Sequence, residues 1–327
     1  MEPSPPFTHI GVDCFGPYAV KERRSELKRW GLLITCMYSR AVHIEILESM
    51  TTDAFINALR CFICIRGPVK TVYCDNGTNF VGAHNELSLE LATMNKALQE
   101  QLQDNMIEFK FNPPGASHAG GVWERQIRTI KSVLNGMLVS YKTRMNTEAL
   151  RAAFYEAMNI INNRPLCIDN LNDPTELVIT PNHLLTMKPR QAPLLPGEFG
   201  RSDIYGRKMW KKVQAFADQF WREWKSGYLT NITKRHKWQH PERSLQIGDL
   251  VMIVEEGQPR NHWPTAIVDE VTPGEDGLTR RVKVRVANRY LDKQGRVMSK
   301  ATVLERPVQK LILLLPKERE CENVTSK

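Results

Sequence analysis

The chain has 327 residues, which is too long for one ordinary hydrophobic core and predicts two or three domains. Hydrophobic residues make up 42% of it and charged residues 25%, which excludes a disordered chain and is typical of a globular protein. The formal net charge is +9, and residues 191–327 carry 25 Lys and Arg against 17 Asp and Glu, whereas residues 1–190 carry 20 against 19. A basic C-terminal part indicates a polyanion such as nucleic acid as partner, with a merely soluble basic domain as the alternative.

The seven cysteines favour free thiols over a disulfide framework, because their number is odd and most lie in apolar runs. Cys61 and Cys64 have C-x-x-C spacing, but no second ligand pair accompanies them, so zinc is not expected there. His236 and His240 are predicted to be solvated helix-end residues. No signal peptide is visible, and no apolar run approaches the roughly 18 residues of a membrane span, so a membrane partner is not expected.

The first 187 residues predict one α/β domain with trailing helices. Gly16-Pro17 is expected to end the first strand, Thr51-Thr52-Asp53 to offer an N-cap for the first helix, and Gly67-Pro68 to stop it. Strand runs that alternate with helical runs predict a mixed five-stranded sheet with flanking helices. The expected strands are 7–15, 29–37, 41–47, 69–74 and 107–111, and the expected helices are 51–66, 84–104, 122–141 and 147–162.

The remainder predicts a linker over 188–206, an aromatic-rich helix within 207–240, a small basic β-barrel that binds DNA over 245–316, and a tail over 317–327. The barrel strands are expected at 250–254, 266–271, 282–286, 297–299 and 308–315. In the helix, an aromatic stripe predicts a packing seam rather than a surface for stacking bases, and its residues are Trp210, Val213, Phe216, Phe220 and Trp224.

Three acidic residues occupy positions that predict metal chemistry. Asp13 lies in the first strand, Asp75 ends another strand before Asn76-Gly77, and Glu124 opens a basic helix. A carboxylate at the end of an apolar strand is costly unless a partner or cation neutralises it. Hard oxygen ligands suit Mg²⁺, and two such ions about 3.5–4 Å apart can hold the attacking and leaving oxygens of a phosphoryl transfer.

The sequences around Asp75 and Glu124 add detail. Asn76-Gly77 is expected to form a turn with positive φ. The alternative is that the tripeptide Asp75-Asn76-Gly77 is only a common structural turn. Glu124, Arg128 and Lys131 share one helix face, which suits a metal ion facing a phosphate chain. The alternative for that face is a solvated helix with an ion pair between residues four apart.

These motifs resemble the catalytic triad of retroviral-type (DDE) integrases, and most closely the integrase of BEL/Pao-like LTR retrotransposons. The shared contexts are Gly-Val-Asp-x-Phe-Gly-Pro at Asp13, Asp-Asn-Gly-Thr-Asn-Phe at Asp75, and Gly-Gly-Val-Trp-Glu-Arg at Glu124. Further C-terminal markers are Gly248-Asp249-Leu250-Val251, Trp263-Pro264 and Arg306-Pro307. The resemblance implies a ribonuclease H-like catalytic core, a helical connector and a small SH3-like β-barrel.

The resemblance also implies the site and its partners. Asp13, Asp75 and Glu124 would be the catalytic residues and the ligands of two Mg²⁺ or Mn²⁺ ions, and Asn79, Arg128 and Lys131 would contact DNA. A homo-oligomer on the element ends and target DNA is expected, with cytoplasmic synthesis and nuclear action. Nothing resembling the family's N-terminal His-His-Cys-Cys module precedes Asp13, so no zinc is expected in this chain.

The hypothesis is therefore DNA integration by a polynucleotidyl transferase that performs 3′-end processing and strand transfer by a two-metal mechanism. The first alternative is a catalytically silent DNA-binding remnant or host-recruited, retrotransposon-derived protein, which the missing zinc module favours. The second is a ribonuclease H-type hydrolase, which the motif contexts and the appended barrel disfavour.

Overall fold

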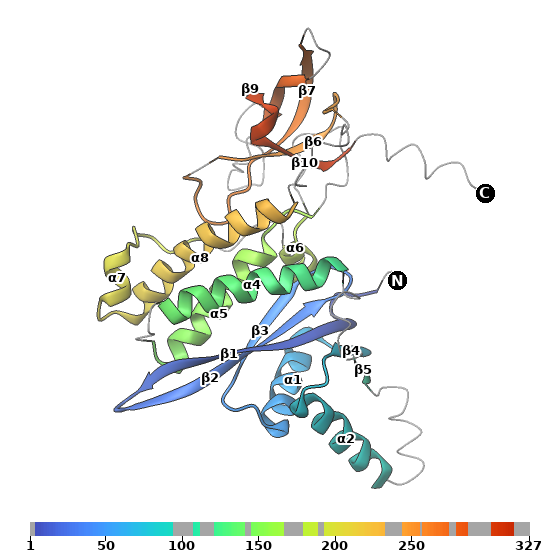
Figure 1. Cartoon of the computed structure of the whole chain (residues 1–327), viewed down its shortest axis with the longest axis vertical. Coiled ribbons are helices and arrows are strands. Elements are labelled where there is room, and N and C mark those ends of the chain that lie inside the picture. The colour runs from blue at the N-terminus through green and yellow to red at the C-terminus, as the bar shows by residue number, and fades with distance from the viewer. Residues whose placement is uncertain are drawn as a thin grey trace, which may run out of the picture. The chain divides into compact units, whose positions relative to one another are not determined.

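The computed structural model divides the chain into two compact units, each described here by itself (Figure 1). The first unit comprises Met1–Asn162 and Ala192–Tyr228, and the second comprises Asn163–Gln191 and Leu229–Lys327. No described helix is long and apolar enough to cross a membrane. The structure describes residues 4–93, 107–111, 121–140, 145–166, 179–188, 193–232, 244–255, 257–274, 279–286 and 302–316.

The first unit is built on a mixed five-stranded sheet of order β3-β2-β1-β4-β5. β1, β2 and β3 are antiparallel, whereas β4 and β5 run parallel to β1. This arrangement confirms the predicted ribonuclease H-like sheet. The strands are β1 (His9–Glu22), β2 (Ser25–Cys36), β3 (Val42–Leu47), β4 (Thr71–Cys74) and β5 (Glu108–Phe111).

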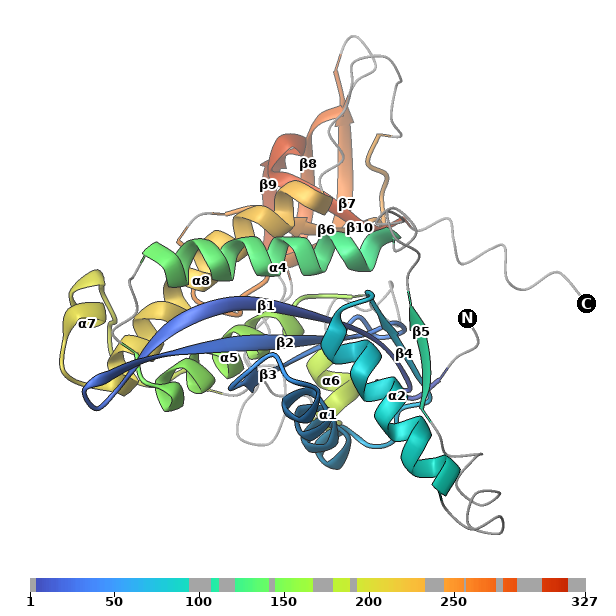
Figure 2. The same ribbon diagram turned by 60° about the horizontal axis from the view of Figure 1, so that its bottom comes forward.

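Helices cover both faces of this sheet, with α4 on one side and α1 and α2 on the other (Figure 2). Side chains alternate along β1, so Phe15 packs against Phe154 of α5 while Cys14 meets Asn79 of α2. α1 also lies close to α2, since a Cβ on Gly82 would come within 2.2 Å of Thr52 Oγ1. These helices are α1 (Thr52–Arg66), α2 (Thr78–Thr93), α4 (Gly121–Ser140) and α5 (Thr147–Asn162).

β1 is longer than its sequence predicts. Gly16-Pro17 does not end the strand, which continues to Glu22 through a register shift between Phe15 and Tyr18. Gly16 adopts φ +114°, which only glycine takes readily. A bulge tolerates proline because the ladder is already interrupted there. The prediction was wrong because it weighed the local turn signal without the long antiparallel partner β2.

Other boundaries differ for local reasons. Of the three residues expected to offer the N-cap of α1, Thr51 supplies it, because its side chain accepts a hydrogen bond from the Ala54 amide. α2 begins at Thr78, six residues before the predicted start, because the turn after Asp75 leads directly into it. In the second unit, residues 308–310 form a 3₁₀ turn between β9 (Thr302–Pro307) and β10 (Leu311–Leu315). The predicted strand at 297–299 lies outside the described residues.

The predicted aromatic helix is α8 (Met209–Ile232), and its stripe is a packing seam as expected. Phe216, Phe220 and Trp224 are buried and stack in succession at centroid distances of 6.5 Å and 6.4 Å. Trp210 departs from the stripe, since it is 48% exposed and meets Phe199 edge to face. The short helix α7 (Arg201–Tyr205) precedes α8, inside the predicted linker.

The second unit holds an antiparallel sheet of order β10-β6-β7-β8-β9, which fits the predicted small barrel-like domain. Its core is aliphatic and includes Val251, Val268 and Val284. Gly248 adopts φ +91°, and Asp249 then accepts the Gln246 amide at 2.8 Å, which explains the local Gly-Asp motif. The remaining elements are α6 (Pro181–Thr186), β6 (Leu250–Ile253), β7 (Thr265–Pro273) and β8 (Thr279–Val286).

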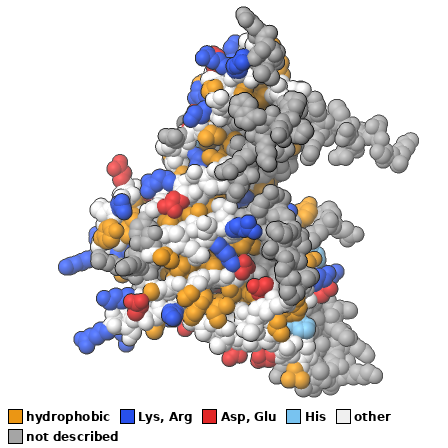
Figure 3. Space-filling model, viewed as in Figure 1, with side chains coloured by type: hydrophobic (Ala, Val, Ile, Leu, Met, Phe, Trp, Pro, Cys, Tyr) orange, Lys and Arg blue, Asp and Glu red, His pale blue; other side chains and the backbone are white. Residues whose placement is uncertain are grey.

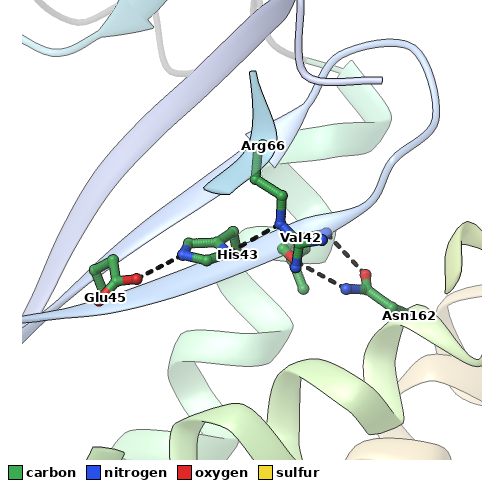
Figure 4. A network of polar contacts seen from close by, with 5 residues as sticks. All are labelled: Val42, His43, Glu45, Arg66 and Asn162. Carbon is green, nitrogen blue, oxygen red and sulfur yellow. Dashed lines mark hydrogen bonds and ion pairs between the residues drawn. The ribbon is translucent and has the colours of Figure 1, made fainter. Parts of the chain in front are cut away.

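A polar network closes the outer edge of the first sheet (Figure 4). β3 is an edge strand, and the Asn162 side chain both accepts the Val42 N–H and donates to the Val42 carbonyl, each at 2.8 Å. Asn162 thus pairs with β3 as an adjoining strand would. Beside it, buried His43 bonds Glu45 at 2.8 Å and accepts from Arg66 Nε at 3.4 Å, linking β3 to α1.

We expect Asn162→Leu to lower the free energy of unfolding by about 2–4 kcal/mol, because two buried backbone groups of Val42 lose their partners. Urea denaturation followed by circular dichroism measures this loss. Asn57→Leu, at an exposed position on α1, is the matched control. Equal loss in both variants would contradict the role of Asn162 at the edge.

Candidate active site

Asp13 and Asp75 lie beside each other on neighbouring parallel strands. β1 and β4 pair Gly11 with Tyr73, and each acid follows two residues later. Adjacent strands are about 4.8 Å apart, so this register brings the two carboxylates into electrostatic range. The negative charge of Asp75 indeed acts on Asp13. The fold therefore brings together two of the three predicted acids.

The turn after Asp75 is shaped by close packing rather than by positive φ. Asp75 Oδ1 accepts the Gly77 amide at 2.9 Å, and Phe80 is buried. Gly77 is absent from the residues with positive φ, so the expected turn conformation was wrong. A Cβ at Gly77 would lie 3.0 Å from both Asp75 Oδ1 and Asn79 Oδ1. Glycine is therefore needed for space, because a side chain would push the carboxylate aside.

Asp13 is a partly buried carboxylate, and its surroundings shift its pKa in opposite directions. Burial raises its pKa above the ordinary value of 3.8, and the neighbouring charge of Asp75 raises it further. Lys131 of α4 opposes both by forming an ion pair with Asp13. The adjacent thiols stay protonated, since burial raises the pKa of Cys14 and of Cys74 to about 12. The site thus offers carboxylate oxygens and no thiolate.

Helix α4 carries the third predicted acid over β1. Lys131 pairs with Asp13, and the Tyr18 hydroxyl donates to Asn135 Oδ1, so this helix face points at the strand. Glu124 precedes Lys131 by two turns on the same face, roughly 10 Å along the axis. Its side chain lies outside the described residues, so the complete triad stays a prediction.

The three predicted DNA contacts occupy different environments. Arg128 is exposed on α4. Lys131 is bound to Asp13. Asn79 is only 5% exposed and donates to Cys14 Sγ at 3.7 Å, which places it beneath the site rather than at its surface. Their contact with DNA stays a prediction.

Tyr18 and Asn135 were missed at the sequence level. Asn135 continues the spacing of Glu124, Arg128 and Lys131 at the eleventh residue, and this signal was present in the sequence. Its partner Tyr18 was hidden because the strand was expected to end before it. Their hydrogen bond fixes α4 on β1 and so positions Lys131 against Asp13.

The expected basic barrel is nearly neutral. Residues 245–316 hold 11 Lys and Arg against 9 Asp and Glu, whereas residues 191–244 hold 11 against 5. Cations on β8 also have acidic partners on adjacent strands: Lys283 pairs with Glu270 at 2.6 Å, and Arg285 with Asp269 at 2.9 Å. The positive charge of the C-terminal part therefore lies mainly before the barrel.

The residues with zinc-ligand spacing in the sequence are Cys61, Cys64, His236 and His240, and the structure describes the two cysteines. Cys61 and Cys64 are exposed free thiols on α1. No group of three or more His, Cys, Asp and Glu side chains gathers within the described part of the chain. His236 and His240 lie outside that part.

Comparison with known families decides the nature of this domain. The family described as Integrase core domain matches residues 4–117, which include Asp13 and Asp75. The N-terminal part of this chain is an integrase core domain. Through residues 4–117 the chain is therefore similar to the catalytic cores of DDE polynucleotidyl transferases. A second family, described as Family of unknown function (DUF5641), matches residues 208–314, from α8 into the C-terminal sheet.

Solved integrase structures are similar to the chain. One is the HTLV-2 integrase catalytic core domain in complex with magnesium (trimeric form), at 19% identity and a TM-score of 0.33, covering 55% of this chain and 97% of that one. Another is the simian T-cell lymphotropic virus intasome in complex with PP2A regulatory subunit B56 gamma, at 12% identity and a TM-score of 0.36, covering 96% of this chain and 80% of that one. A comparison with curated proteins gave no match.

We expect Asp13→Asn to stabilise the integrase core at pH 7 in EDTA. The raised pKa of Asp13 means that its ionised form is disfavoured by folding, and asparagine mimics the protonated form. The gain should be full above the folded-state pKa and should vanish as the pH falls below 3.8, where Asp13 is protonated in both states. Thermal melting across pH measures it, with exposed Glu86→Gln as control. An equal gain at pH 3 and pH 7 would contradict this account.

Proposed function

We propose that this chain is the integrase of a BEL/Pao-like LTR retrotransposon and joins element DNA to target DNA by a two-metal mechanism. The observation that carries the proposal is the juxtaposition of Asp13 and Asp75 on paired strands of an integrase core. The lineage is supported by the sequence contexts of the three acids.

The residues at the site fit a hard divalent cation. Asp13 and Asp75 supply carboxylate oxygens, Glu124 is the expected third donor, and the neighbouring thiols are protonated. Bound Mg²⁺ or Mn²⁺ would supply Lewis-acid stabilisation of the attacking and leaving oxygens of a phosphodiester. Lys131 is poised to exchange Asp13 for a phosphate oxygen, because its ammonium group lies within reach of the site.

The proposed reaction is an in-line displacement at phosphorus. In 3′-end processing, a water oxygen forms the new P–O bond, and the 3′-oxygen of the retained element end leaves and takes up a proton, so the departing nucleotides carry the phosphate at their 5′ end. In strand transfer, the freed 3′-hydroxyl attacks a target phosphodiester, and the target 3′-oxygen leaves. The role of this chain's residues is to fix the carboxylates, through the β1–β4 register and the Gly77 turn, so that attacking and leaving groups align.

The same proposal includes the expected partners. The chain would act as a homo-oligomer on element ends and target DNA, because both ends of an element must be joined to one target. Chromosomal target DNA implies action in the nucleus after synthesis in the cytoplasm.

We expect Asp75→Asn to reduce strand joining by about 10²–10⁴-fold, the loss that follows from several kcal/mol of transition-state stabilisation. The measurement is the joining of a labelled DNA oligonucleotide to a plasmid in Mn²⁺. Lys110→Gln, an exposed substitution on β5 opposite Tyr73, should leave joining unchanged. Joining that survives Asp75→Asn would overturn the proposed activity.

Metal binding should be visible without any turnover. At 100 times its dissociation constant, Mn²⁺ should stabilise the folded chain by about 2.7 kcal/mol, because it binds the folded carboxylate pair and not the unfolded chain. Differential scanning fluorimetry measures the shift for the unmodified chain and for Asp13→Asn, in which it should be largely lost. Equal shifts in both would show that the cation binds elsewhere.

A further inference from the structure

The β1–β2 hairpin extends well past the rest of its sheet. β3 pairs with β2 only as far as Trp30, whereas β1 and β2 remain paired out to Glu22 and Ser25. The end of the hairpin, residues 21–29, therefore projects as a two-stranded arm from the integrase core, at the lower left of Figure 1.

This arm concentrates positive charge. Residues 21–29 hold five of the 20 cations found in residues 1–190, but only two of their 19 acids. Figure 3 shows Lys and Arg side chains gathered at this end of the molecule. Arg23, Arg24 and Lys28 are exposed, and within the described residues none has an acidic partner within 4.0 Å. In this respect they differ from Lys283 and Arg285 of the C-terminal sheet, which are paired.

The turn that joins the two strands carries a second signal. Glu22 pairs with Ser25, so the loop consists of Arg23 and Arg24 alone. Arg23 adopts φ +55°, a conformation in which two-residue hairpin loops favour glycine or asparagine. The turn itself does not favour arginine at this position, so the fold does not explain the presence of its side chain there.

The arm is also fixed to the domain behind it. Glu22 Oε1 accepts the Thr147 amide at 2.8 Å at the start of α5, and Lys21 donates its amide to the Met145 carbonyl at 3.0 Å. Those bonds hold the pKa of Glu22 below its ordinary value, so it stays ionised as an anchor. Because the backbone is held, the cations at the tip form a preorganised surface rather than a loose tail.

We propose that the tip of the β1–β2 hairpin binds the phosphate backbone of duplex DNA, through Arg23, Arg24 and Lys28. This inference rests on the proposed function, since it assigns a second contact to the same DNA. Asp13 lies ten residues before Arg23 on β1, a span of roughly 30 Å at the rise of a β-strand. The phosphates bound by the tip therefore belong to DNA some nine base pairs from the reacting bond, at about 3.4 Å per pair.

The test is the salt dependence of binding of the full chain to a 30-base-pair duplex in EDTA, where no chemistry occurs. The triple variant Arg23→Gly/Arg24→Gln/Lys28→Gln should bind more weakly, and its slope of log affinity against log salt should fall by about 3, one for each phosphate contact. The loss should be the same for unrelated duplex sequences, because phosphates carry no sequence information.

Two variants separate this contact from misfolding and from net charge. Arg23→Gly should keep or raise the melting temperature while lowering the slope by about 1, since glycine suits the left-handed turn. The barrel variant Arg281→Gln/Lys283→Gln/Arg285→Gln removes the same number of cations, but from ion-paired positions, and should change the slope less. Glu26→Gln at the tip should tighten binding.

The outcomes distinguish the two proposals. If the unmodified chain binds no duplex DNA, the proposed function fails and this inference with it. If the chain binds DNA with a steep salt slope that the triple variant leaves unchanged, only the hairpin contact is overturned. If the hairpin and barrel triple variants lower the salt slope equally, net charge alone explains the change. That result would also overturn the hairpin contact. So would a loss seen with single-stranded RNA or an acidic peptide but not with duplex DNA.

Discussion

The constraint on which the site depends is the partial burial of the Asp13 carboxylate next to Asp75, which directly follows the paired strand β4. The register of β1 and β4 forces Asp13 and Asp75 together in a partly buried place, where neither would be chosen for stability. Lys131 of α4 partly neutralises Asp13 through an ion pair. The Tyr18–Asn135 hydrogen bond holds α4 against β1. A divalent cation at this site would relieve both the burial of the Asp13 charge and its repulsion by Asp75.

Paired and unpaired cations lie in different parts of the chain that the structure describes. The C-terminal sheet, expected to be basic, is almost balanced, and cations on β8 pair with acids on neighbouring strands. Exposed pairs of this kind add little stability, but they neutralise a surface. Among the described residues, Arg23, Arg24 and Lys28 lie instead without such partners at the tip of the hairpin that β1, the strand of Asp13, forms with β2. One strand thus links the site of chemistry to the surface proposed to hold DNA.

Errors in the sequence predictions share a physical cause. Gly16-Pro17 was expected to end β1, and Asn76-Gly77 was expected to form a turn with positive φ. Both expectations used local preference alone. In the structure, a long partner strand carries β1 through a bulge, and Gly77 is needed because Asp75 and Asn79 crowd it. Tertiary contacts overrode local turn chemistry in each case.

The sequence by itself determined the order of strands and helices, the ribonuclease H-like sheet and the identity of the candidate acids. Periodicity and sequence context suffice for these, because each is encoded within a short stretch of chain. Only the tertiary structure decided that Asp13 faces Asp75, that Lys131 neutralises Asp13, and that Asn79 is buried beside Cys14. These depend on strand register and helix docking, which bring together residues far apart in the chain and which no local pattern specifies.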